Sequence, residues 1–428
     1  MRKLSLCFIL MLICVSYATA QPITPSAHGL DSHQPAWNQN QIQEFNLNPG
    51  FSWWSTYIDL NDNGLSILQN ALGSDASLIK AQNAFTSYNP DTGDWIGDSF
   101  TIDNSAMYLL KINDCSSSFF LEGNIVHPED INIQVNQGWN WVGYPNTTTV
   151  SVHDALADYN ASNNDMIKGQ FDFSTYSAQQ EEWFGTLNTL TPGNGYIILS
   201  RANETKTFHY SNGSKTADLS VDTPNTRWRT NPKMYAQNMT MIATVRLQGI
   251  DVKSDDYEIG AFHKDECRGT TRLKYIEGLE NYLAFLTVYG TEGESIQFRL
   301  LDYSNDAIYL ADIQQNITYH DNGILGLLDT PYQLEFRDML SAEETLASML
   351  TVYPNPMNST QSLTVSLPES QTLNKNLKIQ VFNLLGQVIS EKTLVGHTCT
   401  IGGLTSGIYM LRVLSDNAAI YNNKLIVK

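Results

Sequence analysis

The chain has 428 residues, of which 42% are hydrophobic and 16% are charged, and its formal net charge at pH 7 is −19. Nucleic-acid binding requires a basic face that neutralises phosphates, so this acidic balance argues against nucleic-acid partners and against docking on anionic lipid. The aromatic content of 11% is typical of folded domains, and at roughly 100–200 residues per domain the length predicts about three of them.

The first twenty residues have the three regions of a secretory signal peptide. Arg2 and Lys3 supply the positive charge, residues 4–15 are almost all apolar, and Ala18-Thr19-Ala20 is a small-residue cleavage site. This apolar run is too short to span a bilayer, and no later segment reaches about 18 unbroken apolar residues. We therefore expect a protein without a transmembrane segment that is cleaved near Ala20 and secreted.

An internal repeat follows the short N-terminal segment at 21–42, at a fixed offset of 88 residues. The offset relates aromatic, lysine and glutamine positions, among them Trp53 and Trp141, Trp95 and Trp183, Lys80 and Lys168, and Gln82 and Gln170. We predict two tandem modules, at 43–130 and 131–213, each with short strands and one short helix. The helices are expected at 66–72 and 152–159, the second with Ser151 as its N-cap.

The second copy carries Gly138-Trp139-Asn140-Trp141 and Pro192-Gly193-Asn194-Gly195-Tyr196. These pieces resemble a module found in many secreted Bacteroidetes proteins, beside enzymes and adhesins alike. The resemblance implies an extracellular domain type and no particular activity.

The tryptophans allow two interpretations. Aromatic rings dominate the packing of small domains, so we expect the repeated pairs Trp53/Trp141 and Trp95/Trp183 to lie in the core. Trp54 and Trp139 have no tryptophan partner in the other copy. These two are the candidates for exposed rings that stack on a glycan.

A polar linker is expected at 214–233, followed by a β-sandwich at 234–336 and a second linker at 337–349. After the signal peptide the remaining cysteines are Cys115, Cys267 and Cys399, one in each of three modules, so disulfides within a module are not expected. Cys267 precedes Arg268, which leaves a reactive thiol as an alternative to a buried one.

The last module, at 350–428, has the alternating strands and turns of another small β-sandwich. Four motifs stand out in it: a Tyr-Pro-Asn-Pro segment, a Leu-Gly-Gln turn, a Gly-x-Tyr strand and a final Lys-Leu-Ile-Val-Lys. Their characteristic residues are Pro354, Asn355, Pro356, Gly386, Gln387, Gly407, Tyr409, Lys424 and Lys428. The set resembles the C-terminal sorting domain of type IX secretion cargo in Bacteroidetes. That resemblance implies export through the outer membrane by the type IX machinery. The stretch from Ile259 to Gly269 resembles a further module common in such cargo.

Catalytic and metal motifs are scarce. The sequence has no His-Glu-x-x-His, no Gly-x-Ser-x-Gly and no phosphate-binding glycine loop. Asp59, Asn61 and Asn63 match the first half of a calcium loop, but the twelfth position is Asn70 instead of Glu, so a polar turn is the alternative. A weak Ca²⁺ site is the one cofactor that the sequence suggests.

Together these features predict a mainly β, multi-domain chain: two small β-rich repeats with a short helix each, then two Ig-like β-sandwiches. The function we expect is that of a secreted or cell-surface, non-enzymatic, adhesin-like protein that binds a ligand, with a glycan or a host or matrix component as the candidates. Two alternatives stay open: a surface hydrolase acting on glycan or peptide, and a structural component of the surface or matrix.

Overall fold

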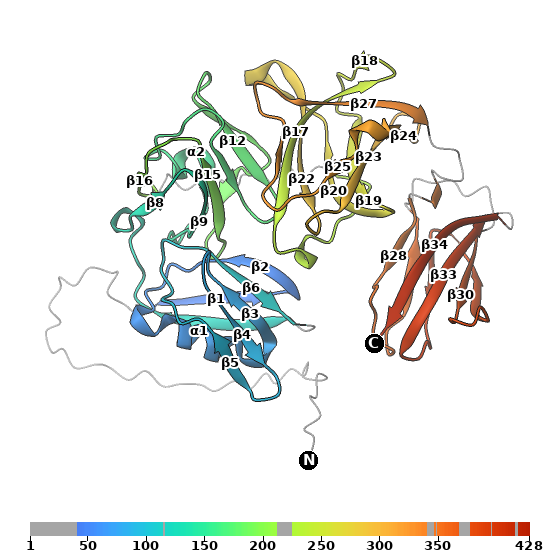
Figure 1. The fold of residues 1–428 in the computed structure, drawn as a ribbon, viewed down its shortest axis with the longest axis horizontal. Coiled ribbons are helices and arrows are strands. Elements are labelled where there is room, and N and C mark those ends of the chain that lie inside the picture. Colours follow the sequence, from blue (N-terminus) through green and yellow to red (C-terminus); the bar gives the residue numbers. More distant parts are fainter. Residues whose placement is uncertain are drawn as a thin grey trace, which may run out of the picture. The chain divides into compact units, whose positions relative to one another are not determined.

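The computed structural model describes residues 41–113, 116–211, 225–339, 346–347, 349–367, 377–394, 396–415 and 418–428. The predicted signal peptide, nearly all of the segment at 21–42, and Cys115 lie outside these ranges. The described chain is mainly β-sheet, as the sequence predicts, and helices α1 and α2 belong to the two N-terminal modules (Figure 1). In these residues no helix is both long and apolar enough to cross a membrane.

The first module is built on a five-stranded antiparallel sheet. In spatial order its strands are β2 (Gly50–Trp54), β6 (Tyr108–Ile112), β3 (Ala76–Lys80), β4 (Phe85–Asn89) and β5 (Asp94–Gly97). Strands β1 (Gln41–Leu47) and β7 (Ser117–Gly123) pair separately, and helix α1 (Gly64–Leu72) lies between the short 3-10 turns η2 (Asn61–Asn63) and η3 (Gly73–Asp75). The helix buries Leu65, Leu68 and Leu72, which lie three and four residues apart on one face.

The second module has the same strand order, and corresponding strands begin 88 residues later, apart from the shorter β11. The strands are β9 (Gly138–Val142), β15 (Tyr196–Ser200), β11 (Met166–Lys168), β12 (Phe173–Ser177) and β13 (Glu182–Gly185). The remaining elements are η4 (Pro128–Asp130), the pair β8 (Ile133–Val135) and β16 (Lys206–Phe208), the pair β10 (Val150–Ser151) and β14 (Thr189–Leu190), and α2 (Val152–Ala155). Ser151 caps α2 by accepting from the N–H of Asp154 at 3.0 Å, but the helix ends at Ala155, four residues earlier than expected.

The third module is one mixed sheet that curls around its own core. Its path runs β20 (Glu266–Arg272), β19 (Tyr257–His263), β23 (Ser295–Asp302), β24 (Ala307–Ala311), β27 (Tyr332–Met339), β17 (Asn238–Leu247), β22 (Asn281–Tyr289) and β21 (Lys274–Ile276). Shorter elements are η5 (Pro232–Met234), β18 (Ile250–Asp251), η6 (Glu277–Leu279), η7 (Ile313–Gln315), β25 (Ile317–Thr318) and β26 (Ile324–Leu325). Long strands β17 and β27 run parallel, with Val245 opposite Leu334. A Cβ placed at Gly269 would lie 2.2 Å from the carbonyl oxygen of Thr287, so β20 packs closely on β22.

Part of the predicted linker at 214–233 belongs to this third module instead. Trp228 is only 4% exposed and packs on Phe262, with ring centroids 5.2 Å apart. The carboxylate of the fully buried Glu258 accepts from the backbone N–H groups of Arg227 and Trp228 at 2.6 and 3.1 Å. Burying a tryptophan ring removes a large apolar area from water. This stabilises the segment against the third module, so it does not behave as a free linker.

The last module is a sandwich of two sheets. One sheet holds β28 (Thr351–Tyr353), β29 (Leu363–Ser366) and β32 (Thr398–Ile401); the other holds β31 (Val388–Thr393), β30 (Leu377–Phe382), β33 (Gly407–Ser415) and β34 (Ala418–Val427). Every second residue of β30 and β33 points into the core, where Ile379 and Val413 meet Val365 of the facing sheet.

Candidate functional site

The side chain of Asn355 ties the Tyr-Pro-Asn-Pro segment to the final strand. Its Nδ2 donates to the carbonyl oxygen of Lys424 at 2.7 Å, and its Oδ1 accepts from the N–H of Ile426 at 3.1 Å. Asn355 lies between Pro354 and Pro356, both preceded by cis peptide bonds. The motifs from the two ends of the last module are therefore one structural unit.

The Gly-x-Tyr motif lies at the same end of the sandwich. Gly407, where β33 begins, pairs with Val427, near the end of β34. Tyr409 is buried, and its hydroxyl donates to the carbonyl oxygen of Thr405 at 2.9 Å. Lys428 donates through its backbone to the segment that follows the second proline, at 2.8 Å.

The Leu-Gly-Gln turn completes this cluster of motifs. Phe382, the last residue of β30, pairs with Met410 of β33, and the turn follows directly after Phe382. Gly386 has a φ of +80°, a left-handed conformation that favours glycine. Asn383 Oδ1 accepts from the N–H of Gln387 at 2.9 Å, which closes the turn. All four predicted sorting motifs therefore meet at one end of the module.

Apolar side chains are exposed at that end. Val388 and Met410 both pair with Phe382, so they share the outer face of the sheet. The turn adds Leu384 and Leu385, which are 72% and 84% exposed. Exposed leucines are ordinary when single, but a contiguous group marks an interaction surface. We call this group the apolar end face; it comprises Leu384, Leu385, Val388, Ile408 and Met410.

The two repeat modules contact each other, and each module contributes the same set of equivalent residues to the contact. Gln170 Nε2 donates to the carbonyl oxygen of Phe51 at 2.8 Å, and its Oε1 accepts from the N–H of Trp53 at 3.4 Å. Gln82 makes the same two bonds to the equivalent residues of β9, at 3.2 and 2.9 Å. We call this contact the seam; its residues are Phe51, Trp53, Lys80, Gln82, Trp139, Trp141, Lys168 and Gln170.

Backbone bonds across the seam are reciprocal as well. Ser55 donates to the carbonyl oxygen of Gly193 at 3.1 Å, and Gly143 donates to that of Ser105 at 2.8 Å. Each of these pairs is the other shifted by 88 residues in both partners. Such reciprocity characterises a two-fold interface between identical subunits. The two modules therefore form a pseudo-dimer within one chain.

The lysines of the seam differ in burial. Lys168 is fully buried, and its Nζ lies 4.7 Å from the ring centroid of Trp139 and 5.8 Å from that of Trp53. It donates to the backbone and side-chain oxygens of Asn238, at 2.9 and 3.0 Å. Burial lowers the pKa of Lys168 to about 7. Its equivalent, Lys80, is half-buried. The third module, which supplies Asn238, therefore covers only one side of the pseudo-dimer.

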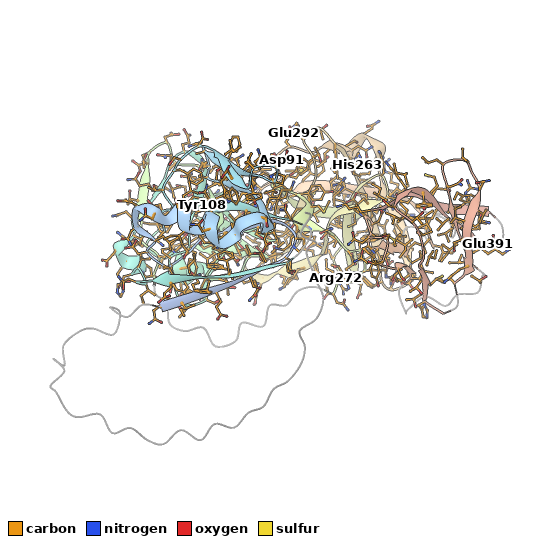
Figure 2. All side chains as sticks on the ribbon, turned by 90° about the horizontal axis from the view of Figure 1, so that it is seen from below. Asp91, Tyr108, His263, Arg272, Glu292 and Glu391 are labelled. Atoms are coloured by element: carbon orange, nitrogen blue, oxygen red, sulfur yellow. The ribbon has the colours of Figure 1, made fainter. Side chains whose placement is uncertain are left out.

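The two tryptophans predicted to stack on a glycan are not fully exposed to solvent. Trp54 is 1% exposed and packs in the first module against Phe45 and Tyr108, with ring centroids 5.4 and 6.0 Å apart (Figure 2 labels Tyr108). The expectation that Trp54 is exposed is wrong, because β2 is covered by its own core on one face and by the seam on the other. Trp139 is half-buried, with the Nζ of Lys168 over its ring.

The repeated tryptophans take two different positions. Trp53 and Trp141 face the other module at the seam instead of the core of their own. Trp95 and Trp183 are half-buried and pack on tyrosines of the neighbouring strand, with ring centroids 5.6 and 5.3 Å apart. Recurrence in the sequence therefore marked packing positions, but not which partner each ring packs against.

A pocket of about 180 Å³ opens beside the seam. Trp53 and Tyr196 contribute to its buried floor, and the exposed ring of Phe171 lies at its rim. Asp172 also lines the pocket, and burial raises the pKa of its carboxyl group to about 6. A partly desolvated carboxylate in a cavity is typical of a binding site.

The proposed calcium residues lie where a helix starts. Asp59 Oδ1 accepts from the N–H of Asn61 at 2.9 Å, and Asn61 and Asn63 form the turn η2 that leads into α1. Within the ranges described above, no group of three or more His, Cys, Asp or Glu side chains is placed to hold a metal ion. A weak Ca²⁺ site that also uses amide oxygens stays a prediction.

Two other groups, the carboxylate of Asp165 and the thiol of Cys267, have structural partners. Asp165 accepts from Lys206 Nζ and from the hydroxyl of Tyr159, both at 2.9 Å. Cys267 donates from its thiol to the carbonyl oxygen of Gly269 at 3.4 Å, and burial raises its pKa to about 12. That pKa favours the unreactive interpretation of Cys267, because the thiolate is the reactive form.

Residues 351–428 match the secretion system C-terminal sorting domain family. This match confirms the sorting-domain prediction for the last module and supports export of the chain as type IX secretion cargo. No curated protein matches the chain.

Solved structures with immunoglobulin-like and fibronectin-like domains are similar to parts of the chain. A cytokine receptor complex is 10% identical, covers 43% of this chain and 95% of its own, and has a TM-score of 0.15. The fibronectin(III)-like modules of Clostridium thermocellum CbhA are 11% identical over 44% and 93%, with a TM-score of 0.14. The FN1-FN3 domains of chicken CNTN1 are 7% identical over 69% and 96%, with a TM-score of 0.16. TM-scores this low support no conclusion about the function of this chain.

The seam and the pocket were missed by sequence reasoning. The seam could have been suspected from Gln82 and Gln170, because polar residues kept at equivalent positions of a repeat are not core residues. The pocket has a signal too: at equivalent positions Asp172 replaces Ala84, and Gly195 replaces Met107.

Proposed function

We propose that this chain is a non-enzymatic, ligand-binding protein that the type IX machinery delivers to the cell surface or the medium. The observation that carries the proposal is the meeting of the four sorting motifs at one end of the last module, where Asn355 joins the first motif to the last. The resemblance of the repeats to modules of secreted Bacteroidetes proteins supports an extracellular location, and the adhesin-like role is part of the proposal.

The export signal is the apolar end face together with the motifs that shape it. The motif residues themselves are largely used in turns and strand pairing, so they set the shape of this end of the module. The exposed Leu384 and Leu385 offer apolar area to a partner, and burying such area drives protein association.

The ligand-binding half of the proposal rests on the repeat pair. The seam fixes two β-rich modules against each other, and the pocket with Asp172 lies beside it. Binding sites of this kind, a small cavity with a few converging polar groups, occur where modules meet.

The export test replaces both Leu384 and Leu385 by Asp in a bacterium that carries the type IX system. We expect loss of the protein from the cell surface and the medium, with accumulation inside the outer membrane. Thr393→Asp is the matched control, because Thr393 is exposed at the far end of the same hairpin strand. Normal export of the double variant would overturn the role of the apolar end face, and turnover of a glycan or peptide by the purified chain would overturn the non-enzymatic assignment.

A further inference from the structure

The pocket beside the seam belongs to one copy of the repeat only. Its residues Asp172, Asn194 and Gly195 replace Ala84, Ala106 and Met107 of the first copy. A Cβ placed at Gly195 would lie 2.1 Å from Cγ of Met107, which is fully buried, so the glycine is required by the close approach of the first module. The close packing of the seam explains Gly195, but it does not explain why Ala is replaced by Asp.

The backbone carbonyl of Asp172 accepts from the N–H of Gly169 at 2.9 Å, but its side chain has no evident structural role. Among the described residues, no Lys, Arg or His forms an ion pair with its carboxylate, and Lys168, four residues earlier, donates to Asn238 instead. Within the described part of the chain the carboxylate accepts from its own backbone N–H alone, and burial raises its pKa to about 6. Placing a carboxylate in a poorly solvated site costs stability unless a partner satisfies it. A ligand that donates hydrogen bonds is such a partner.

The other lining groups limit the chemistry of that ligand. An ionised carboxylate only accepts hydrogen bonds, whereas the hydroxyls of Thr189 and Thr191 and the amide of Asn194 both donate and accept. Phe171, 53% exposed, adds an aromatic surface at the rim. A ligand that meets all of these needs several hydroxyl groups and an apolar ring face, and a sugar ring has both. The volume of about 180 Å³ is below the roughly 300–1,000 Å³ of pockets for drug-sized ligands, so it suits one ring.

We propose that this pocket binds a single sugar residue of a glycan, with Asp172 accepting from its hydroxyl groups and Phe171 stacking on its ring. The inference rests on the ligand-binding function proposed above and names the ligand of that site. It replaces Trp54 and Trp139, as the expected sugar contacts, with Asp172 and Phe171 of the second module.

The test measures binding of the purified full chain to an array of defined glycans and, by titration, to glucose, galactose, mannose and N-acetylglucosamine. Asp172→Asn and Phe171→Ala are compared with Asp91→Asn and Phe120→Ala. Asp91 lies in the exposed turn after β4 (Figure 2), and Phe120 is 61% exposed on β7, so both controls change similar groups away from the pocket. Because hydrogen bonds to charged groups contribute about 1.5–3 kcal/mol, we expect Asp172→Asn to weaken binding by about 10- to 100-fold. The controls should bind as the wild type does.

The outcomes separate this inference from the function on which it rests. Saturable sugar binding that is weakened by both pocket variants, and by neither control, supports the inference. Glycan binding that ignores Asp172 and Phe171 overturns the pocket and leaves a ligand-binding protein. Binding of Nα-acetyl-lysine amide through Asp172, without any sugar binding, overturns the sugar assignment. No binding of any of these probes overturns the inference, while the export half of the proposed function is judged by its own test. Because Phe171 is an exposed rim residue, Phe171→Ala keeps the test valid if Asp172→Asn fails to fold.

Discussion

The two glutamines of the seam give a matched pair of mutations, because their side chains bond equivalent backbone groups but differ in burial. Gln170 is 9% exposed, whereas Gln82 is exposed. Both side chains donate to a carbonyl oxygen and accept from an N–H of the other module, at 2.8 and 3.4 Å for Gln170 and at 3.2 and 2.9 Å for Gln82. Replacing each glutamine by Ala therefore tests how strongly burial changes the contribution of equivalent hydrogen bonds to the free energy of unfolding.

We expect Gln170→Ala to lower the free energy of unfolding by about 2–4 kcal/mol. Each buried group that loses its partner costs about 1–3 kcal/mol, and the 3.4 Å bond contributes the smaller share. For Gln82→Ala water replaces the lost side chain, so a loss of about 1 kcal/mol or less is expected. The difference between the two variants is the quantity of interest, because it does not depend on helix or strand propensity at unequal positions.

Urea denaturation followed by tryptophan fluorescence measures this difference. Six of the eight tryptophans lie in the two repeat modules, so the signal reports mainly on the pseudo-dimer. Equal losses for the two variants, or a larger loss for Gln82→Ala, would refute the reasoning that the third module makes the seam unequal.

Two further predictions concern titratable groups. The pKa of Lys168 is about 7 in the folded chain and 10.5 ordinarily, so between these values the unfolded state holds more protons and stability should rise as the pH is raised from 7 to 10. Lys168→Met should flatten that rise, and parallel profiles for the two proteins would contradict the assignment. The thiol of Cys267, with its pKa raised to about 12, should react slowly with iodoacetamide at pH 8 in the native protein and rapidly in urea. Fast labelling of the native protein, read by mass spectrometry, would show that Cys267 is not protected.

Much of the fold could be predicted because hydrophobic periodicity and repeat offset are local properties of the sequence. The offset of 88 residues recurs in the strand starts of both sheets, and Ser151 caps its helix as expected. Periodicity shows that a face is buried, but not which surface buries it. Trp53 and Trp54 are adjacent and both buried, a pattern that a single module cannot explain; contacts with the second and third modules bury Trp53.

The candidate site was harder to predict, because it depends on contacts between modules. From the sequence, Lys168 resembles an ordinary surface lysine of a strand. Its burial follows from a contact with Asn238, seventy residues later, which the sequence does not reveal. Asp172 reads as a polar turn residue until its equivalent Ala84 is set beside it. Comparison of the two copies position by position was the one route by which the sequence alone could have shown the pocket.

The pseudo-dimer has a consequence for how this chain could change over time. Two separate subunits meet only as their concentration allows, whereas two halves joined by a short connection meet at an effective concentration in the millimolar range for flexible links. The two linked modules therefore stay associated even when substitutions remove some of the symmetric contacts. The same loss would make a dimer of separate subunits dissociate. One half is free to keep the symmetric contact, with Gln82 and Lys80 in a solvated setting, while the other acquires Asp172 and a cavity. Covalent linkage of the halves thus converts a symmetric contact into a scaffold on which only one side has to specialise.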